Sequence, residues 1–226
     1  MWHAKPSGSY GYSSTEGYEN IVEMSGYFTS LGYTLESQAG IIGNAVAESG
    51  LNPWRWQSDT YNLNGGYGLF QFTPASGYID GCKDIQFYAP NLSTSEVTEG
   101  AEATDGMAQL QAFAFNTLSK WGSGCWRSYW NKTTYADLYA VRERILNTYG
   151  SGSSLSMEQF KTIDNVYDAT FAFLACFEGP AVPNMSTRYE YASAVYEILT
   201  GKLPDDPTTP TTKRKSLPIW MMLRPF

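Results

Sequence analysis

The chain has 226 residues, of which 42% are hydrophobic and only 16% charged; this fits one well-buried globular domain with an appendage. A formal net charge of −7 argues against nucleic acid as a partner, because phosphate binding needs clustered Lys and Arg. The 17 Tyr and 7 Trp favour either an aromatic-rich core or a weakly polar ligand such as a sugar or a peptide.

The first part of the chain predicts two helices behind an N-terminal arm at 1–14. Apolar residues at helical spacing predict an amphipathic helix over 18–32. Thr34 suits the N-cap of a second helix over 35–48, whose small residues would allow close packing. Gly50 suits the C-terminal cap of that second helix.

The segment TYNLNGGYGLFQF at 60–72 predicts a small β hairpin, because Asn-Gly-Gly stands between two short alternating stretches. A loop is expected over 81–100. Helical patterns return at 103–121, 134–149, about 156–177 and 186–200, the third opening on a capping box of Ser156 and Gln159. The predicted fold class is therefore mainly α, with the hairpin between the second and third helices.

The composition changes after Leu203, which divides the chain into a main domain at 15–201 and two short C-terminal segments. The Pro/Thr-rich stretch at 202–213 predicts an extended linker. The basic and apolar tail at 214–226 is too short to span a bilayer, and we expect it to dock on a partner. A contact with a membrane surface and folding back onto the domain are the alternatives. The N-terminal sequence MWHAKPSGSYGYSST lacks the apolar region of a signal peptide.

The Cys and His residues predict no metal site. Cys82, Cys125 and Cys176 lack the spacing of metal ligands, and one His excludes an ordinary His-based zinc site or a Ser-His triad. Cys176 lies in the apolar run FAFLACF, which predicts a buried thiol. The other two cysteines could form a disulfide if the protein works outside a cell. No cofactor is expected.

Glu48 is the candidate for chemistry, because it ends the apolar second helix just before a Ser-Gly break. The helix end would fix the carboxyl rigidly, and the hairpin would supply one wall of a groove. Apolar neighbours such as Leu51 and Trp54 would favour the protonated carboxyl with which a general acid protonates a glycosidic oxygen. A solvated helix end is the other interpretation.

Three stretches in order resemble the phage tail lysozyme family: NIVEMSGYFTSLGYTLESQAGIIGNAVAESGLNPWRWQ, GYGLFQFTPASGYI and FLACFEGPAVPNMSTRYEYA. The resemblance covers about residues 15–200. It implies a lysozyme-like, wall-degrading domain of mainly α (α+β) class whose small β hairpin lines the active-site groove. ESGLNP is shared by lysozyme-like folds in general, including lytic transglycosylases, whereas GYGLFQFTPASGYI is more specific to this family.

The resemblance also implies roles for individual residues. Glu48 matches the family's catalytic acid. Gln71 would hydrogen-bond a hydroxyl or N-acetyl group, and Gly68 would let the glycan approach the backbone, although a turn also explains the glycine. The expected substrate-binding residues are Trp54, Gly68, Gln71 and Phe72, with Phe72 also a candidate for the core.

Polar residues beside the motifs have structural interpretations. Ser49 is expected to brace the helix end, because no base is available to make it a nucleophile. Glu178 and Arg188 predict an ion pair that ties the last helices together, and a catalytic Glu178 is the alternative.

A two-carboxylate hydrolase has its second carboxylate about 5–5.5 Å from the acid in a retaining enzyme or about 6.5–9.5 Å in an inverting one. We predict Asp59, which lies just before the hairpin, and Asp80 on its other side is the alternative. Several lysozyme-like folds manage with one essential Glu, and a lytic transglycosylase would need no second carboxylate, because the sugar's own hydroxyl closes the ring.

The resulting hypothesis is a muramidase that cleaves the β-1,4 bond between N-acetylmuramic acid and N-acetylglucosamine. It would sit at a phage tail tip and open the bacterial wall for DNA. Its expected partners are peptidoglycan and phage tail proteins, which the tail at 214–226 would contact. The alternatives are a lytic transglycosylase on the same bond, a non-catalytic glycan-binding tail component, and an endolysin for host lysis.

Overall fold

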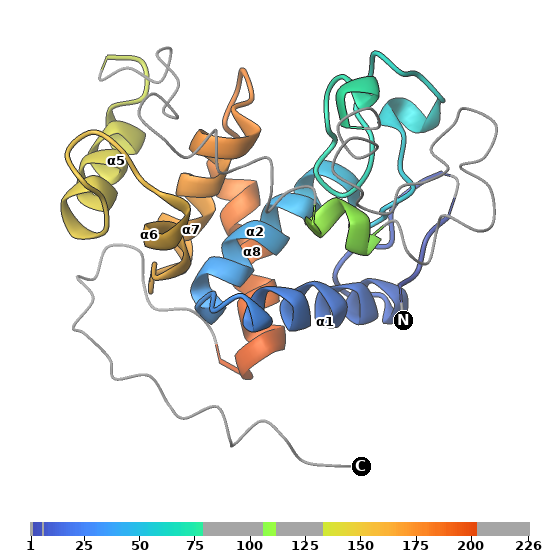
Figure 1. Cartoon of the computed structure of the whole chain (residues 1–226), viewed down its shortest axis with the longest axis horizontal. Helices are drawn as coiled ribbons and strands as arrows, with labels where there is room; N and C mark the ends of the chain where they lie inside the picture. Colours follow the sequence, from blue (N-terminus) through green and yellow to red (C-terminus); the bar gives the residue numbers. More distant parts are fainter. Residues whose placement is uncertain (1, 6, 79–105, 112–132, 203–226) are drawn as a thin grey trace.

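The computed structural model describes residues 2–5, 7–78, 106–111 and 133–202. Within these ranges the molecule is built almost wholly from helices (Figure 1), and none of them is long and apolar enough to cross a bilayer. Several predictions lie outside the described residues: those on Asp80, Cys82, Cys125, the loop at 81–100, most of the helix at 103–121, and the linker and tail beyond Lys202.

The first two helices begin and end at capping residues. α1 spans Thr15–Ser30 and α2 spans Leu35–Ser49. The Thr34 side chain accepts a backbone hydrogen bond from the first turn of α2, and Gly50 closes the helix in the left-handed conformation at φ 61°. Both predicted caps of α2 are therefore confirmed, and they place Glu48 in the last turn of a well-defined helix.

The later helices are α5 (Ala136–Thr148), α6 (Met157–Lys161), α7 (Val166–Phe173), the π-helical turn η2 (Leu174–Glu178) and α8 (Met185–Thr200). The capping box of Ser156 and Gln159 is confirmed at the start of α6. The continuous helix predicted from there to about 177 is wrong. Asn165 has an extended backbone, and its side chain accepts a hydrogen bond from Asp168 N, which starts α7 as a new helix.

The core forms around α2, which packs against α7 and α8 and lies among the other helices (Figure 1). Two glycines permit this close approach. A Cβ on Gly40 would lie 2.7 Å from the α7 backbone, and one on Gly43 would lie 2.5 Å from Ala192 of α8. The predicted close packing of this small-residue helix is confirmed, and Cys176 is buried in the same core, as predicted.

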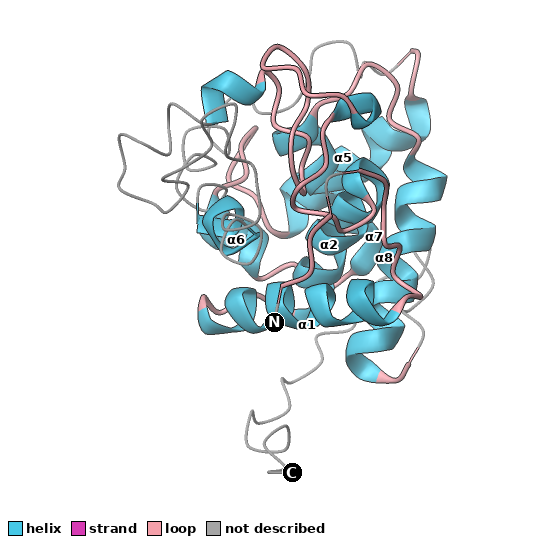
Figure 2. Ribbon diagram, turned by 90° about the vertical axis from the view of Figure 1, so that its right-hand side faces the viewer, coloured by secondary structure: helices cyan, strands magenta, loops and turns pink. Residues whose placement is uncertain are grey.

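The predicted β hairpin is wrong for the described residues: the segment at 51–78, here called the turn segment, contains no strand (Figure 2). It has only isolated antiparallel bridges, Trp56–Tyr67 and Tyr67–Phe72. Gly68 and Gln71 have φ of 79° and 45°, so the chain reverses between the bridged residues instead of extending as a strand. The prediction of a turn at Asn-Gly-Gly is confirmed, but the stretches on either side of it form further turns where strands were predicted.

The N-terminal arm is held against the turn segment by a buried side chain, Asn52. Its Nδ2 donates to Lys5 O and Gly8 O at 2.9 and 2.8 Å. Its Oδ1 accepts from Lys5 N and Trp54 N at 3.2 and 3.1 Å. Four backbone groups therefore depend on one amide, which joins the arm to the chain just beyond α2.

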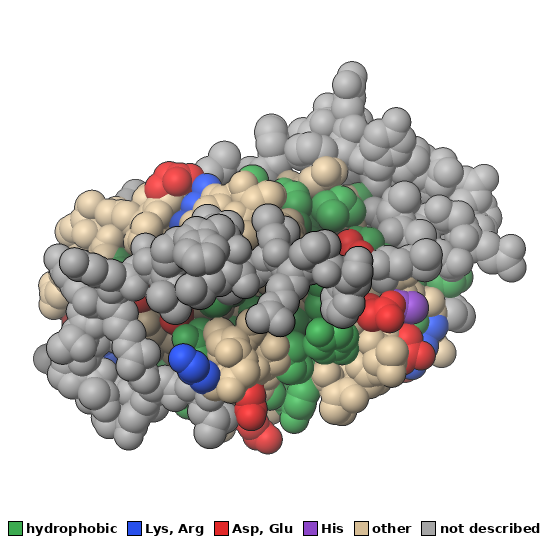
Figure 3. All heavy atoms as spheres, turned by 90° about the horizontal axis from the view of Figure 1, so that it is seen from below, with side chains coloured by type: hydrophobic (Ala, Val, Ile, Leu, Met, Phe, Trp, Pro, Cys, Tyr) green, Lys and Arg blue, Asp and Glu red, His purple; other side chains and the backbone are tan. Residues whose placement is uncertain are grey.

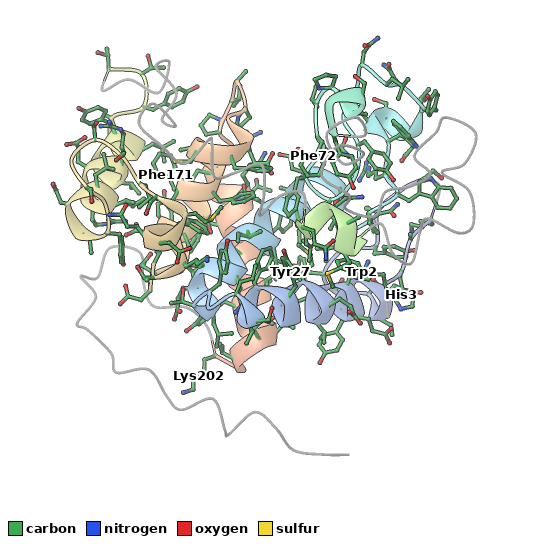
Figure 4. All side chains as sticks on the ribbon, viewed as in Figure 1. Trp2, His3, Tyr27, Phe72, Phe171 and Lys202 are labelled. Carbon is green, nitrogen blue, oxygen red and sulfur yellow. The ribbon has the colours of Figure 1, made fainter. Side chains whose placement is uncertain are left out.

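The arm also contacts α1. Trp2 is buried in the main core, beside the short helix at 106–111 (Figure 4). His3 lies with its ring 2.5 Å from the Glu19 carboxylate, and Figure 3 shows this one histidine of the chain at the molecular surface beside acidic side chains. Hydrogen bonding to His3 lowers the pKa of Glu19.

We expect Asn52→Ala to lower the free energy of unfolding by about 2–3 kcal/mol, because it leaves buried backbone groups without partners. Chemical denaturation followed by circular dichroism measures this. Asn64→Ala, at an exposed position in the same segment, should change stability by less than about 0.5 kcal/mol. Equal effects of the two substitutions would contradict the anchoring role of Asn52.

Candidate active site

A cleft of about 890 Å³ opens beside the C-terminal end of α2. One wall comes from the turn segment and the other from the end of η2 and the residues after it, which flank the end of α2 in Figure 1. Residues that line the cleft include Glu48, Arg55, Phe70, Gln71, Phe72, Tyr78, Phe177 and Glu178. The cleft thus combines two carboxylates with an aromatic surface.

Glu48 enters the cleft from the last turn of α2 and is sheltered without being closed off. Its side chain is 21% exposed, and Arg188 Nη2 donates to its Oε1. No described hydrogen bond uses Oε2. Leu51 and Trp54, which we expected to shelter Glu48, do not line the cleft. Glu48 is therefore a fixed carboxyl group at a cleft. The other interpretation, in which Glu48 is simply a solvated residue at a helix end, is wrong.

Arg188 belongs to a chain of polar contacts that crosses the core. Its side chain is 8% exposed, and its Nη1 donates to Asn44 Oδ1 at 2.8 Å. Asn44 Nδ2 donates in turn to Gly40 O and Thr170 O at 2.8 and 3.2 Å. We expected Arg188 to pair with Glu178, and the structure instead gives it Glu48 as its ionic partner.

The end of α2 is braced from the turn segment. Ser49 is buried, and its hydroxyl is 3.0 Å from both Ala45 O and Leu69 O, which confirms the bracing role predicted for it. Arg55 Nη1 donates to Ser49 O at 3.2 Å, as basic side chains often do at a helix C-terminus. These contacts hold the backbone next to Glu48 at a fixed distance from the turn segment, which forms one wall of the cleft.

The aromatic side of the cleft is built on a stacked pair. The rings of Phe72 and Tyr78 lie 4.6 Å apart and nearly parallel, at 9°. Phe72 also meets the rings of Phe70 and Phe177 edge-on, at 5.9 and 6.2 Å, and Figure 4 places it where the turn segment meets the helices. Phe72 therefore packs on the core and also lines the cleft, and its role in substrate binding stays a prediction.

Gln71 lines the cleft in a constrained backbone conformation with φ 45°. Its Nε2 donates to Arg55 O and Gly68 O at 3.2 and 3.0 Å, which uses both amide hydrogens. The side chain therefore offers a ligand its acceptor oxygen, Oε1. This suits a hydroxyl group or an N-acetyl N–H as the bonding partner.

Gly68 and Trp54 do not line the cleft. Gly68 is buried with φ 79°, and a Cβ there would lie 2.3 Å from the Gln109 side chain. Gln109 fills this space because it accepts from Leu69 N and donates to Pro53 O, both at 2.6 Å. Trp54 packs on a separate aromatic cluster centred on Trp56 and Tyr67. Gly68 is therefore needed for the turn, which was the other interpretation of this glycine. The sequence around Gln109 gave no sign that its side chain braces this turn.

Asp59 also lies off the cleft. Its Oδ1 accepts from Gly8 N at 2.7 Å and lies 3.8 Å from Arg55 Nε, so this carboxylate helps to fix the N-terminal arm. Glu178 is the second carboxylate that the structure brings to the cleft, half-buried at the end of the π-helical turn η2. The FEGP stretch signalled Glu178, but sequence alone could not tell a cleft residue from an ion-pair partner.

A second depression, of about 550 Å³, lies between the arm and α8, where Tyr12, Tyr18 and Glu197 are among its lining residues. Its described lining contains a single carboxylate, whereas the cleft beside Glu48 contains two. The cleft is therefore the stronger candidate for acid-base chemistry.

We expect Gly68→Ala to destabilise the fold more than Gly32→Ala, although both glycines have similar φ of 79° and 83°. The added methyl group meets Gln109 only at position 68, and open space at position 32 leaves backbone strain alone. Thermal unfolding of the two variants measures the difference, which we expect to exceed about 1 kcal/mol. Equal losses would show that Gly68 is required for its φ only.

The chain is similar to known phage proteins. A family model described as phage tail lysozyme matches residues 19–199. Morphogenesis protein 1 of Bacillus phage B103 is 25% identical over 178 residues, which is 78% of this chain but 38% of that relative. The chain thus spans well under half the length of this relative. The matched region contains both carboxylates of the cleft, whereas most of the N-terminal arm lies before it.

Proposed function

The chain belongs to the phage tail lysozyme family, and we propose that its cleft hydrolyses peptidoglycan as a muramidase. The bond cleaved is the β-1,4 linkage between N-acetylmuramic acid and N-acetylglucosamine. The observation that carries this proposal is Glu48, a carboxyl group fixed at a helix end, sheltered by Arg188 and open to a cleft with an aromatic wall.

In this proposal Glu48 protonates the glycosidic oxygen as the bond to the sugar C1 breaks. A second carboxylate then supplies or activates the nucleophile at C1, and we assign this role to Glu178, because it lines the same cleft as Glu48. Asp59 keeps its structural role on the arm. Gln71 Oε1 accepts a hydrogen bond from the glycan, and Phe72 with Tyr78 offers an apolar face to a sugar ring.

We expect Glu48→Gln to remain folded but to lose at least about a hundredfold in the rate of release of soluble fragments from purified walls. The amide keeps the size of the side chain and cannot donate the acidic proton. Asp59→Asn is the matched control, an equally conservative change outside the cleft, and it should keep most of the activity. Wild-type activity in Glu48→Gln would refute the proposed role.

The products distinguish hydrolysis from transglycosylation, which uses the same acid on the same bond. Mass spectrometry of released muropeptides should find reducing ends, whose oxygen comes from water. If 1,6-anhydro ends are found instead, the enzyme is a lytic transglycosylase and not a muramidase. In that case Glu178→Gln should remain active, because this reaction needs no second carboxylate. Binding to walls without any soluble product would favour a non-catalytic glycan-binding component.

We also propose that the protein is carried on the phage particle and acts during wall penetration. The family description refers to phage tails, and the name of the B103 relative refers to morphogenesis. The tail at 214–226 would then dock on other tail proteins. Immunoblots of purified particles should detect the protein, and its presence only in the lysate would favour an endolysin.

A further inference from the structure

A chain of polar contacts leads from the core to Glu48, and it begins at backbone carbonyl groups of α2 and α7. Asn44 is fully buried, and its amide donates to Gly40 O on α2 and to Thr170 O on α7. Because both amide hydrogens are engaged, the orientation of Asn44 is set and its Oδ1 faces Arg188. Core packing therefore fixes Asn44 Oδ1, the atom that accepts the hydrogen bond from Arg188.

Arg188 reaches this acceptor from the first turn of α8 and uses its two terminal nitrogens on different partners. Nη1 binds Asn44 and Nη2 binds Glu48, so one planar group joins a core amide to the carboxylate in the cleft. Among its other donors, Nε is buried and has no hydrogen-bond partner within the described residues. Burial of this cation with an unmet donor costs stability, which argues for a role beyond packing.

We propose that Arg188 is a positioning residue that clamps Glu48 Oε1 and leaves Oε2 for the substrate. The inference rests on the proposed function, since it concerns the group assigned as the acid. The clamp restricts the carboxyl group to one geometry, in which it would meet the glycosidic oxygen of a bound glycan.

Other charged side chains also reach the cleft. Arg55 in the turn segment and Glu178 on η2 line it together with Glu48. Arg188 on α8 differs from both in its direct hydrogen bond to Glu48 and in its nearly complete burial. Removal of Arg188 should therefore have the larger effect on the orientation of the Glu48 carboxyl group.

The test compares Arg188→Met, Arg188→Lys and Arg144→Met in the full chain. Arg144 is the matched control, because it forms an ion pair with the buried Asp168 on α7 and lines no part of the cleft. Burial raises the pKa of Asp168, and the hydrogen bond from Arg144 opposes this. Loss of Arg144 should lower stability without a change in kcat.

For Arg188→Met we expect kcat on a soluble peptidoglycan fragment to fall at least about tenfold. KM should change by less than about twofold, because Gln71 and the aromatic wall of the cleft stay in place. Arg188→Lys keeps the charge but not the two-pronged geometry. It should therefore also have a reduced kcat at an unchanged KM, and this variant serves alone if Arg188→Met does not fold.

An unchanged kcat in Arg188→Met, with only the melting temperature lowered as in Arg144→Met, would overturn the positioning role. So would a wild-type kcat in Arg188→Lys. These failures are distinct from failure of the proposed function, which Glu48→Gln reports with Arg188 intact. An inactive Glu48→Gln together with a wild-type kcat in Arg188→Met would leave the acid assigned and remove only the clamp.

Discussion

The close packing of α2 against α7 and α8 is the constraint on which the rest of the structure depends. Glycines at 40 and 43 let the neighbouring backbones approach to distances that a Cβ would prevent. The same packing buries Asn44 and brings α8 near enough for Arg188 to reach the end of α2. The rigidity of Glu48 is thus a consequence of core packing, and the carboxyl group stands at the point where the core meets the cleft.

The opposite wall is positioned by different means. The turn segment has no strand ladder within the described residues, and side-chain contacts replace that ladder. Ser49 binds Leu69 O, Gln109 fills the space beside Gly68, and Asn52 holds the N-terminal arm. These bonds join residues 20, 40 and 44 positions apart in the chain, so they tie the turn segment to elements on either side of it. A wall built this way can present Gln71 and Phe72 to a ligand while its backbone groups keep their hydrogen-bond partners.

The sequence predicted the helices well where caps and periodicity agree, as at Thr34, Gly50 and Ser156. It also indicated Glu48, because an acidic residue at the end of an apolar helix is conspicuous. The break at Asn165 was missed, since apolar periodicity continues through it. The partner of Arg188 and the roles of Asp59 and Gly68 depend on contacts between segments far apart in the chain, about which spacing along one sequence says nothing.

The central claim is that a glycan binds with its scissile oxygen at Glu48. The most direct measurement is a crystal structure of the Glu48→Gln variant with a bound peptidoglycan fragment. The account predicts a glycosidic oxygen about 2.6–3.2 Å from the side chain at position 48, with a sugar ring against Phe72 and Tyr78. A fragment bound in the depression beside Tyr12 and Tyr18, with the cleft empty, would contradict it.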